Sequence, residues 1–159
     1  MRLRFALIAI AASAGCVSVD VTEAERPELR QSIVPADEQR LYDELHFSPA
    51  MRAGDYIFVS GVVAGMRPTE TGDMAMEQSF DRAFRGVSSV LEAAGADWGD
   101  VVEITTYHTD LPAQFQLFSQ VKDRHVGEPY PAWTAIDVDR LLPDNGIVEI
   151  RVIAYAPRD

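Results

Sequence analysis

Two residues near the C-terminal end of the sequence have side chains able to take part in chemistry. Glu149 lies in "GIVEIRVIAYA" (146–156), where apolar residues alternate with polar ones as they do along a half-buried strand. Taken alone, Glu149 is a carboxylate on the less apolar face of that strand. It is then either solvated or paired with Arg151, which lies two residues further along the same face.

The second residue is Trp133, in "EPYPAWTAIDV" (128–138), where a large aromatic side chain stands at the start of an alternating strand. Two interpretations stay open. Tryptophan is enriched at protein interfaces, so Trp133 packs between subunits, or its indole stacks against a bound ligand.

Other residues that often mark active sites give little signal. His46, His108 and His125 are too far apart for the tight spacing of a metal site. We find neither a glycine-rich phosphate loop nor a nucleophile elbow. The sequence therefore predicts no metal and no cofactor.

Composition sets limits on the class of protein. The chain has 159 residues, of which 47% are hydrophobic, enough for one domain with a core of its own. Its formal net charge is −11, which argues against a sequence-independent nucleic-acid binder, because such a protein needs clustered Lys and Arg. We therefore expect no nucleic-acid partner.

The N-terminus has the layout of an export signal. Basic "MRLR" is followed by apolar "FALIAIAASA" and a small-residue ending, too short to span a bilayer. Ala12-Ser13-Ala14 fits a general cleavage site, whereas Ser13-Ala14-Gly15-Cys16 resembles a bacterial lipobox. Cys16 is the only cysteine, and we interpret it as a lipid anchor; the alternative is a soluble exported protein with an idle thiol.

These features divide the chain into three parts. We predict a lipoprotein-type signal peptide over 1–15, a flexible polar tether over 16–40 and a folded domain over 41–159. The expected location is the bacterial periplasm, with the protein held at the membrane only through its N-terminal lipid.

Within the domain, periodicity predicts alternating strands and helices. Strands are expected at 56–59, ending at Ser60-Gly61, and at 101–109, 132–138 and 146–156; helices are expected at 76–94 and 111–127. The economical arrangement is an α+β fold, one mixed β-sheet with two helices packed on one face. The second face, on which we place Ile153 and Trp133, would stay uncovered, so the sequence predicts a homo-oligomer.

Four segments in order resemble the RidA/YjgF family, also called L-PSP endoribonucleases. They are "HFSPAMRAGDYIFVSG", "VLEAAGADWGDVVEITTYHTDL", "PYPAWTAIDVDRLLP" and "VEIRVIA". The resemblance implies a chorismate-mutase-like, RidA-like α+β fold and a homotrimer with ligand clefts between subunits. It also implies hydrolysis of reactive enamines and imines to a carbonyl compound and ammonia.

The resemblance also assigns site residues. Active family members carry arginine in a Pro-Ala-Arg motif to grip the substrate carboxylate, and here that position is Trp133. Losing such a charge-assisted contact removes about 1.5–3 kcal/mol per hydrogen bond. This places the chain with the arginine-lacking branch of the family.

The remaining assignments follow from the same resemblance. Glu149 matches the cleft glutamate that holds or activates water, which makes it the expected catalytic residue. The expected substrate-binding residues are Trp133, its neighbour Thr134, Phe47, which stands where many members have tyrosine, and the Ser60-Gly61 pair.

Two functions follow from this pattern, and the sequence leaves both open. One is hydrolysis of an enamine or imine other than the usual imino acids, by a deaminase-type enzyme. The alternative is a non-catalytic trimer that binds a ligand or serves as a scaffold. The acidic charge and the export signal disfavour the ribonuclease that the older family name suggests.

Overall fold

The structure, a computed structural model, describes residues 30–158. It contains a six-stranded sheet in the order β1-β2-β3-β6-β4-β5, three helices and one short 3-10 turn. The strands are β1 (Arg30–Ile33), β2 (Ala50–Ala53), β3 (Tyr56–Gly65), β4 (Val101–His108), β5 (Ala132–Asp137) and β6 (Gly146–Tyr155). The helices are α1 (Gln39–Leu45), α2 (Gly72–Ala93) and α3 (Leu111–His125), and the turn is Trp98–Asp100.

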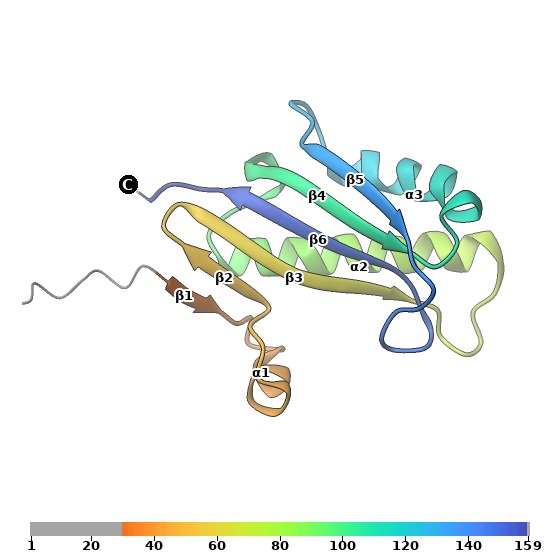
Figure 1. The fold of residues 1–159 in the computed structure, drawn as a ribbon, viewed down its shortest axis with the longest axis horizontal. Helices are drawn as coiled ribbons and strands as arrows, with labels where there is room; N and C mark the ends of the chain where they lie inside the picture. The colour runs from red at the N-terminus through yellow and green to blue at the C-terminus, as the bar shows by residue number, and fades with distance from the viewer. Residues whose placement is uncertain (1–29, 159) are drawn as a thin grey trace, which may run out of the picture.

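The sheet is mixed. Every neighbouring pair of strands is antiparallel except β4 and β5, which run parallel and are joined through α3. Figure 1 shows α2 and α3 lying behind the sheet, on one side of it, while the other side faces the viewer. The predicted α+β fold with two helices on one face is therefore confirmed. The third helix, α1, buries none of its residues and lies at the β1–β2 end.

The two long helices form as their apolar spacing predicts. Phe80, Phe84 and Leu91 of α2 are fully buried, and Gly95 ends this helix with a φ of 72°. In α3, Phe118 is fully buried, and Asp110 caps the N-terminus by accepting a hydrogen bond from the backbone N–H of the helix.

Two boundaries differ from the expectation. The tether expected over 16–40 contains β1, which pairs with β2 along its whole length. A four-residue edge strand with only Ile33 buried has too short a pattern to be recognised in a sequence. Strand β3 also continues through Ser60-Gly61 to Gly65. A bulge between Val59 and Val62 shifts its register with β6 without ending the strand.

The expected signal peptide (1–15), Cys16 and the first part of the tether lie outside the described residues. Among the helices that the structure describes, none combines the length and the apolarity that crossing a membrane would require.

The sheet has two unlike faces. On the covered face, Val148, Ile150 and Val152 of β6 are fully buried beneath α2 and α3. The other face, called the open face from here on, has no helix over it (Figure 1). Phe58 pairs with Ile153 there, as expected for Ile153.

The prediction from the sequence that Trp133 lies on the open face is wrong. Trp133 pairs in register with Ile104 of β4, whose side chain is completely buried, so both residues point toward α3. The sequence pattern of β5 is too weakly alternating to fix which of its two faces is buried. Its direction follows from the parallel pairing with β4, which the sequence does not reveal.

Candidate functional site

The bulge in β3 is held by hydrogen bonds to the segment that precedes β2. The backbone N–H of Ser60 donates to the carbonyl oxygen of Pro49 at 2.9 Å, and its hydroxyl donates to the carbonyl oxygen of Ser48 at 2.7 Å. These bonds fix the path of the chain immediately before Gly61. A fixed backbone at this point matters because Glu149 lies against it.

Glu149 occupies the space that a side chain at position 61 would need. A Cβ atom built on Gly61 would lie 1.7 Å from Oε1 of Glu149 and 2.4 Å from its carboxyl carbon. Only glycine lets the carboxyl group rest over the backbone in this way. Glu149 is half-buried on the open face, with Val63 of β3 and Tyr107 of β4 as its cross-strand neighbours.

A cavity of about 270 Å³ opens beside this point. Its wall contains three of the site residues predicted from the sequence, Phe47, Ser60 and Gly61. The other lining residues come from α1 and the segments on either side of it, from β3 and from α2: Glu38, Leu41, Pro49, Val62 and Val90. Gly61 thus lines the cavity and also lies against the carboxyl group of Glu149, although Glu149 itself is not among the lining residues.

Glu38 is a member of this cavity that sequence analysis missed. Burial, together with the charge of neighbouring Asp37, raises the pKa of its carboxyl group above the ordinary value. The residue falls in the segment interpreted as a tether, where an acidic pair looks like a solvated linker. The only available signal was its position just before a short helix.

Trp133 lies on the other side of the sheet from Glu149. Its ring stacks on Phe115 of α3, with the centroids 5.6 Å apart and an interplanar angle of 4°. Its indole N–H donates a hydrogen bond of 3.1 Å to Oγ1 of Thr106. Thr134, which follows it in β5, is exposed and points to the open face. A single chain therefore does not bring Trp133 and Glu149 together.

A buried hydrogen-bond chain fixes the orientation of Trp133. Because the indole donates to Thr106, the Thr106 hydroxyl can donate to Nε2 of His108, 2.9 Å away. Nδ1 of His108 then carries the proton and donates to Oε1 of Gln114 at 3.1 Å. Burial lowers the pKa of fully enclosed His108, and the hydrogen bond that His108 donates to Gln114 and the charge of Asp137 oppose this shift. A neutral imidazole can accept the hydrogen bond from the Thr106 hydroxyl at Nε2.

The possible pairing of Glu149 with Arg151 is not observed. Arg151 stands opposite Thr105 on the open face, and among residues 30–158 no ion pair joins it to Glu149. Within the same range, no group of three or more His, Cys, Asp or Glu residues is arranged to hold a metal ion.

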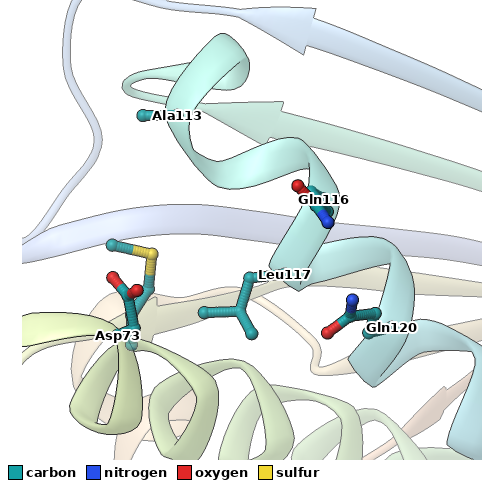
Figure 2. Close-up of a pocket in the computed structure, with 6 residues that line it drawn as sticks. Asp73, Ala113, Gln116, Leu117 and Gln120 are labelled. Carbon is teal, nitrogen blue, oxygen red and sulfur yellow. The ribbon is translucent and has the colours of Figure 1, made fainter.

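A second cavity, of about 290 Å³, lies between the first turns of α2 and the middle of α3. Figure 2 shows Asp73 on α2 facing Gln116, Leu117 and Gln120 on α3. One carboxylate and two carboxamides over an apolar floor offer hydrogen bonds, but they form neither a nucleophile nor an acid–base pair. We therefore place the candidate site at the cavity beside Gly61.

Comparison with known proteins identifies relatives of this chain. The family model Endoribonuclease L-PSP matches residues 37–156. RutC family protein YjgH of Escherichia coli is 38% identical over 129 residues, which is 80% of this chain and 96% of that protein. The solved structure of Protein YJGH superposes with a TM-score of 0.70 at 36% identity, covering 82% of this chain and 99% of that one.

Some relatives carry the name of an activity. A protein of Dermatophagoides farinae named 2-iminobutanoate/2-iminopropanoate deaminase is 29% identical over 108 residues, 67% of this chain and 83% of its own. The fold, the length of the match and the identity to YjgH together show that this chain belongs to the RidA/YjgF family, some of whose members are named as imine deaminases.

Proposed function

We propose that this chain hydrolyses the C=N bond of an enamine or imine, with Glu149 as the catalytic carboxylate. The observation that carries the proposal is the position of this carboxyl group, half-buried on the open face and held against Gly61, which also lines the cavity of about 270 Å³. A half-buried carboxylate can hold a water molecule and accept its proton.

The reaction needs one water molecule and no other co-reactant. An enamine first takes up a proton on carbon and becomes the protonated imine. Glu149 then accepts a proton from water as that water adds to the imine carbon, which gives a neutral carbinolamine. The same carboxyl group returns the proton to nitrogen, the C–N bond breaks, and the hydroxyl proton leaves with the ammonia, so that a carbonyl compound and ammonium are released.

We place the complete cleft between copies of the chain, in a homotrimer. The open face carries exposed Tyr56, Phe58 and Tyr155 beside half-buried Ile153, an apolar group that the chain itself does not cover. Glu149 lies on this face and Trp133 on the other, so a neighbouring copy is needed to bring both to one ligand.

Ammonia release tests the proposed hydrolysis. Imines are generated in situ by an amino-acid oxidase acting on alanine or phenylalanine, and the rate is compared with the spontaneous one. We expect clear acceleration by the wild-type protein and a loss of roughly a hundredfold or more for Glu149→Gln. Glu103→Gln, which removes a carboxylate from β4, serves as the control. Equal rates for wild type and Glu149→Gln would contradict the assignment.

The alternative, a ligand-binding protein without catalysis, is favoured by one observation. The position at which the family resemblance expects arginine holds a tryptophan that is stacked on Phe115 and bonded to Thr106. Binding of carboxylic acids without any acceleration of imine hydrolysis would support this second function.

We further propose that the protein is exported to the periplasm and anchored by lipid at Cys16. The support is the sequence of residues 1–16, basic, then apolar, then small residues before the single cysteine. Cell fractionation should find the wild-type protein with membranes and the Cys16→Ala protein released. A Cys16→Ala protein that still pellets with membranes would overturn this proposal.

A further inference from the structure

The cavity beside Gly61 carries a negative charge. Of the residues that the structure describes, the charged one in its wall is Glu38, and no lysine, arginine or histidine lines it. Phe47 contributes an aromatic ring and Ser60 a hydroxyl group, while the remaining side chains of the wall are aliphatic. A carboxyl group in a largely apolar wall favours a ligand with a positive charge and an apolar body.

The carboxyl group of Glu38 has no capping or ion-pair partner among the described residues. Glu38 stands at the N-cap of α1, where an acidic side chain usually accepts a hydrogen bond from the helix backbone, yet it accepts none there. It forms no ion pair within residues 30–158. The residue is half-buried, and both causes of its raised pKa, burial first and then the charge of Asp37, disfavour the carboxylate. A cation from outside the chain would supply the missing partner.

The short helix α1 places this carboxyl group at the cavity. Leu41 of α1 lines the cavity beside Glu38, and the helix buries none of its own residues. Figure 1 shows α1 at the β1–β2 end of the molecule. It precedes the four segments in which the resemblance to the family lies, the first of which begins at His46. The negative charge of the cavity therefore comes from outside those segments.

The position of the family's arginine changes in the same sense. Trp133 stands there, and its indole carries no charge with which to hold a carboxylate. Glu38 adds an anion at the cavity, which repels a carboxylate and attracts an ammonium group. Phe47 is 40% exposed and offers a ring face on which a cation can rest. With about 270 Å³ of space, the cavity is near the lower limit of roughly 300 Å³ for small-molecule pockets, so its ligand is small.

We propose that Glu38 holds the positively charged nitrogen of a small organic ligand, whose apolar body lies against Leu41 and Phe47 in the cavity. The ligand class is protonated amines and imines that carry an apolar group and no carboxylate. This inference rests on the proposed hydrolysis at Glu149 where it names a substrate, and on the cavity alone where it names a ligand. For a substrate, Glu38 favours the protonated imine, which is the form that water attacks, in preference to an imino acid.

Glu149 is the competing carboxylate, because it lies against Gly61, which also lines the cavity. Glu149 belongs to the open face of β6 and is not itself a lining residue. A cation held by Glu149 would therefore sit at the open face rather than in the wall that Glu38 and Leu41 form. Charge-neutral variants of the two glutamates separate these possibilities.

Calorimetric binding of three matched probes to the wild-type protein tests the charge. The probes are 2-phenylethylammonium, neutral 2-phenylethanol and 3-phenylpropanoate. We expect the cation to bind about tenfold to a hundredfold more tightly than the alcohol, and the acid to bind more weakly than the alcohol. Glu38→Gln should abolish the preference for the cation, and Glu38→Lys should reverse it in favour of the acid. Glu44→Gln, which removes the same charge from an exposed position on α1, should leave the preference unchanged.

A reversal of preference in Glu38→Lys is a result that a merely structural role of Glu38 would not give. Because Glu38 makes no cap hydrogen bond, neither change removes a contact that α1 needs. Three results would overturn the assignment. They are no measurable binding of 2-phenylethylammonium to wild type at millimolar concentration, an unchanged preference in Glu38→Gln, and loss of the preference in Glu149→Gln with retention in Glu38→Gln.

Rates of imine hydrolysis test the substrate class. A flavin-dependent amine oxidase acting on 2-phenylethylamine supplies an imine without a carboxylate, and an amino-acid oxidase acting on phenylalanine supplies the matching imino acid. Acceleration of ammonia release by wild type should be greater for the first imine, and Glu38→Lys should lower the ratio of the two accelerations at least about tenfold. An unchanged ratio would overturn the substrate class. If wild type prefers the ammonium probe through Glu38 but accelerates neither hydrolysis, the cation site stands and the proposed hydrolysis fails.

Discussion

The covered and open faces are formed by the same strands, but their polar side chains differ in whether they are bonded within the chain. On the covered face, polar groups such as Thr106, His108 and Gln114 are buried and bonded to one another. On the open face, Glu149 and Arg151 make no ion pair within the described chain, and Phe58 is partly exposed. The first arrangement stabilises one chain, whereas the second leaves groups available to a ligand or to another copy. Substitutions on the two faces should therefore have different consequences.

The largest effect on stability should come from the covered face. Phe118 is completely buried and contacts the rings of Phe80, Phe84, His108 and Trp133. Phe118→Ala should lower the free energy of unfolding by about 3–5 kcal/mol, measured by equilibrium denaturation. Phe58→Ala, the matched change on the open face, should cost the isolated chain at most about 1 kcal/mol. Similar losses from both changes would show that the open face is part of the core of each chain.

Substitutions on the open face should disrupt assembly more than they destabilise each chain. A carboxylate in place of Phe58 would be buried unpaired against the neighbouring copy, at a cost of several kcal/mol. We therefore expect Phe58→Asp to convert the proposed trimer into a folded monomer, as measured by light scattering and circular dichroism. Met74→Asp, at a highly exposed position on α2, is the control and should stay assembled. A Phe58→Asp protein with the mass of wild type would move the interface away from the open face.

A smaller and more local effect is expected at Gly61. Gly61→Ala places a methyl group where the carboxyl group of Glu149 now lies, so that side chain must turn away. We expect loss of most imine hydrolysis, with a fall of about 1–3 kcal/mol in unfolding free energy. In a Glu149→Ala background the same change should cost much less, and the difference is the coupling between the two positions. Additive costs would mean that the two positions do not interact.

The sequence predicted most of the fold because the two long helices carry strong apolar stripes with clear ends. Gly95 and Pro112 are local signals that need no tertiary information, and both lie where expected. The edge strand β1 was missed because four residues with one buried side chain hold no periodic pattern. Its hydrogen bonds come from β2, twenty residues away in the chain.

The candidate site was predictable only in part, because some of its residues are brought together by contacts between segments far apart in the sequence. Phe47, Ser60 and Gly61 were assigned by resemblance, and the structure brings them to one cavity. The side of the sheet that Trp133 faces depends on the parallel register with β4, a non-local property. Glu38 lines the cavity together with residues of β3 and α2 that are distant in the sequence, so its own position before a short helix carries little signal. Residues placed by tertiary packing alone stayed outside the sequence analysis.

The smallest expected effect sharpens the comparison through pH. His108 is buried and neutral, and burial lowers its pKa below the ordinary value of about 6.5. As pH falls through that value, the unfolded chain takes up a proton that the folded chain still refuses. The unfolding free energy should therefore decrease with falling pH, by at most about 1.4 kcal/mol per pH unit, until the lowered pKa of the folded state is reached.

His108→Gln keeps one donor and one acceptor toward Gln114 and Thr106 but does not titrate, so this part of the slope should disappear. Denaturation midpoints of both proteins across the acidic range give the comparison, because the two chains differ only at position 108. An unchanged slope in the variant would show that His108 takes up its proton as readily in the fold as in the unfolded chain, which would contradict the neutral, buried imidazole that accepts from Thr106.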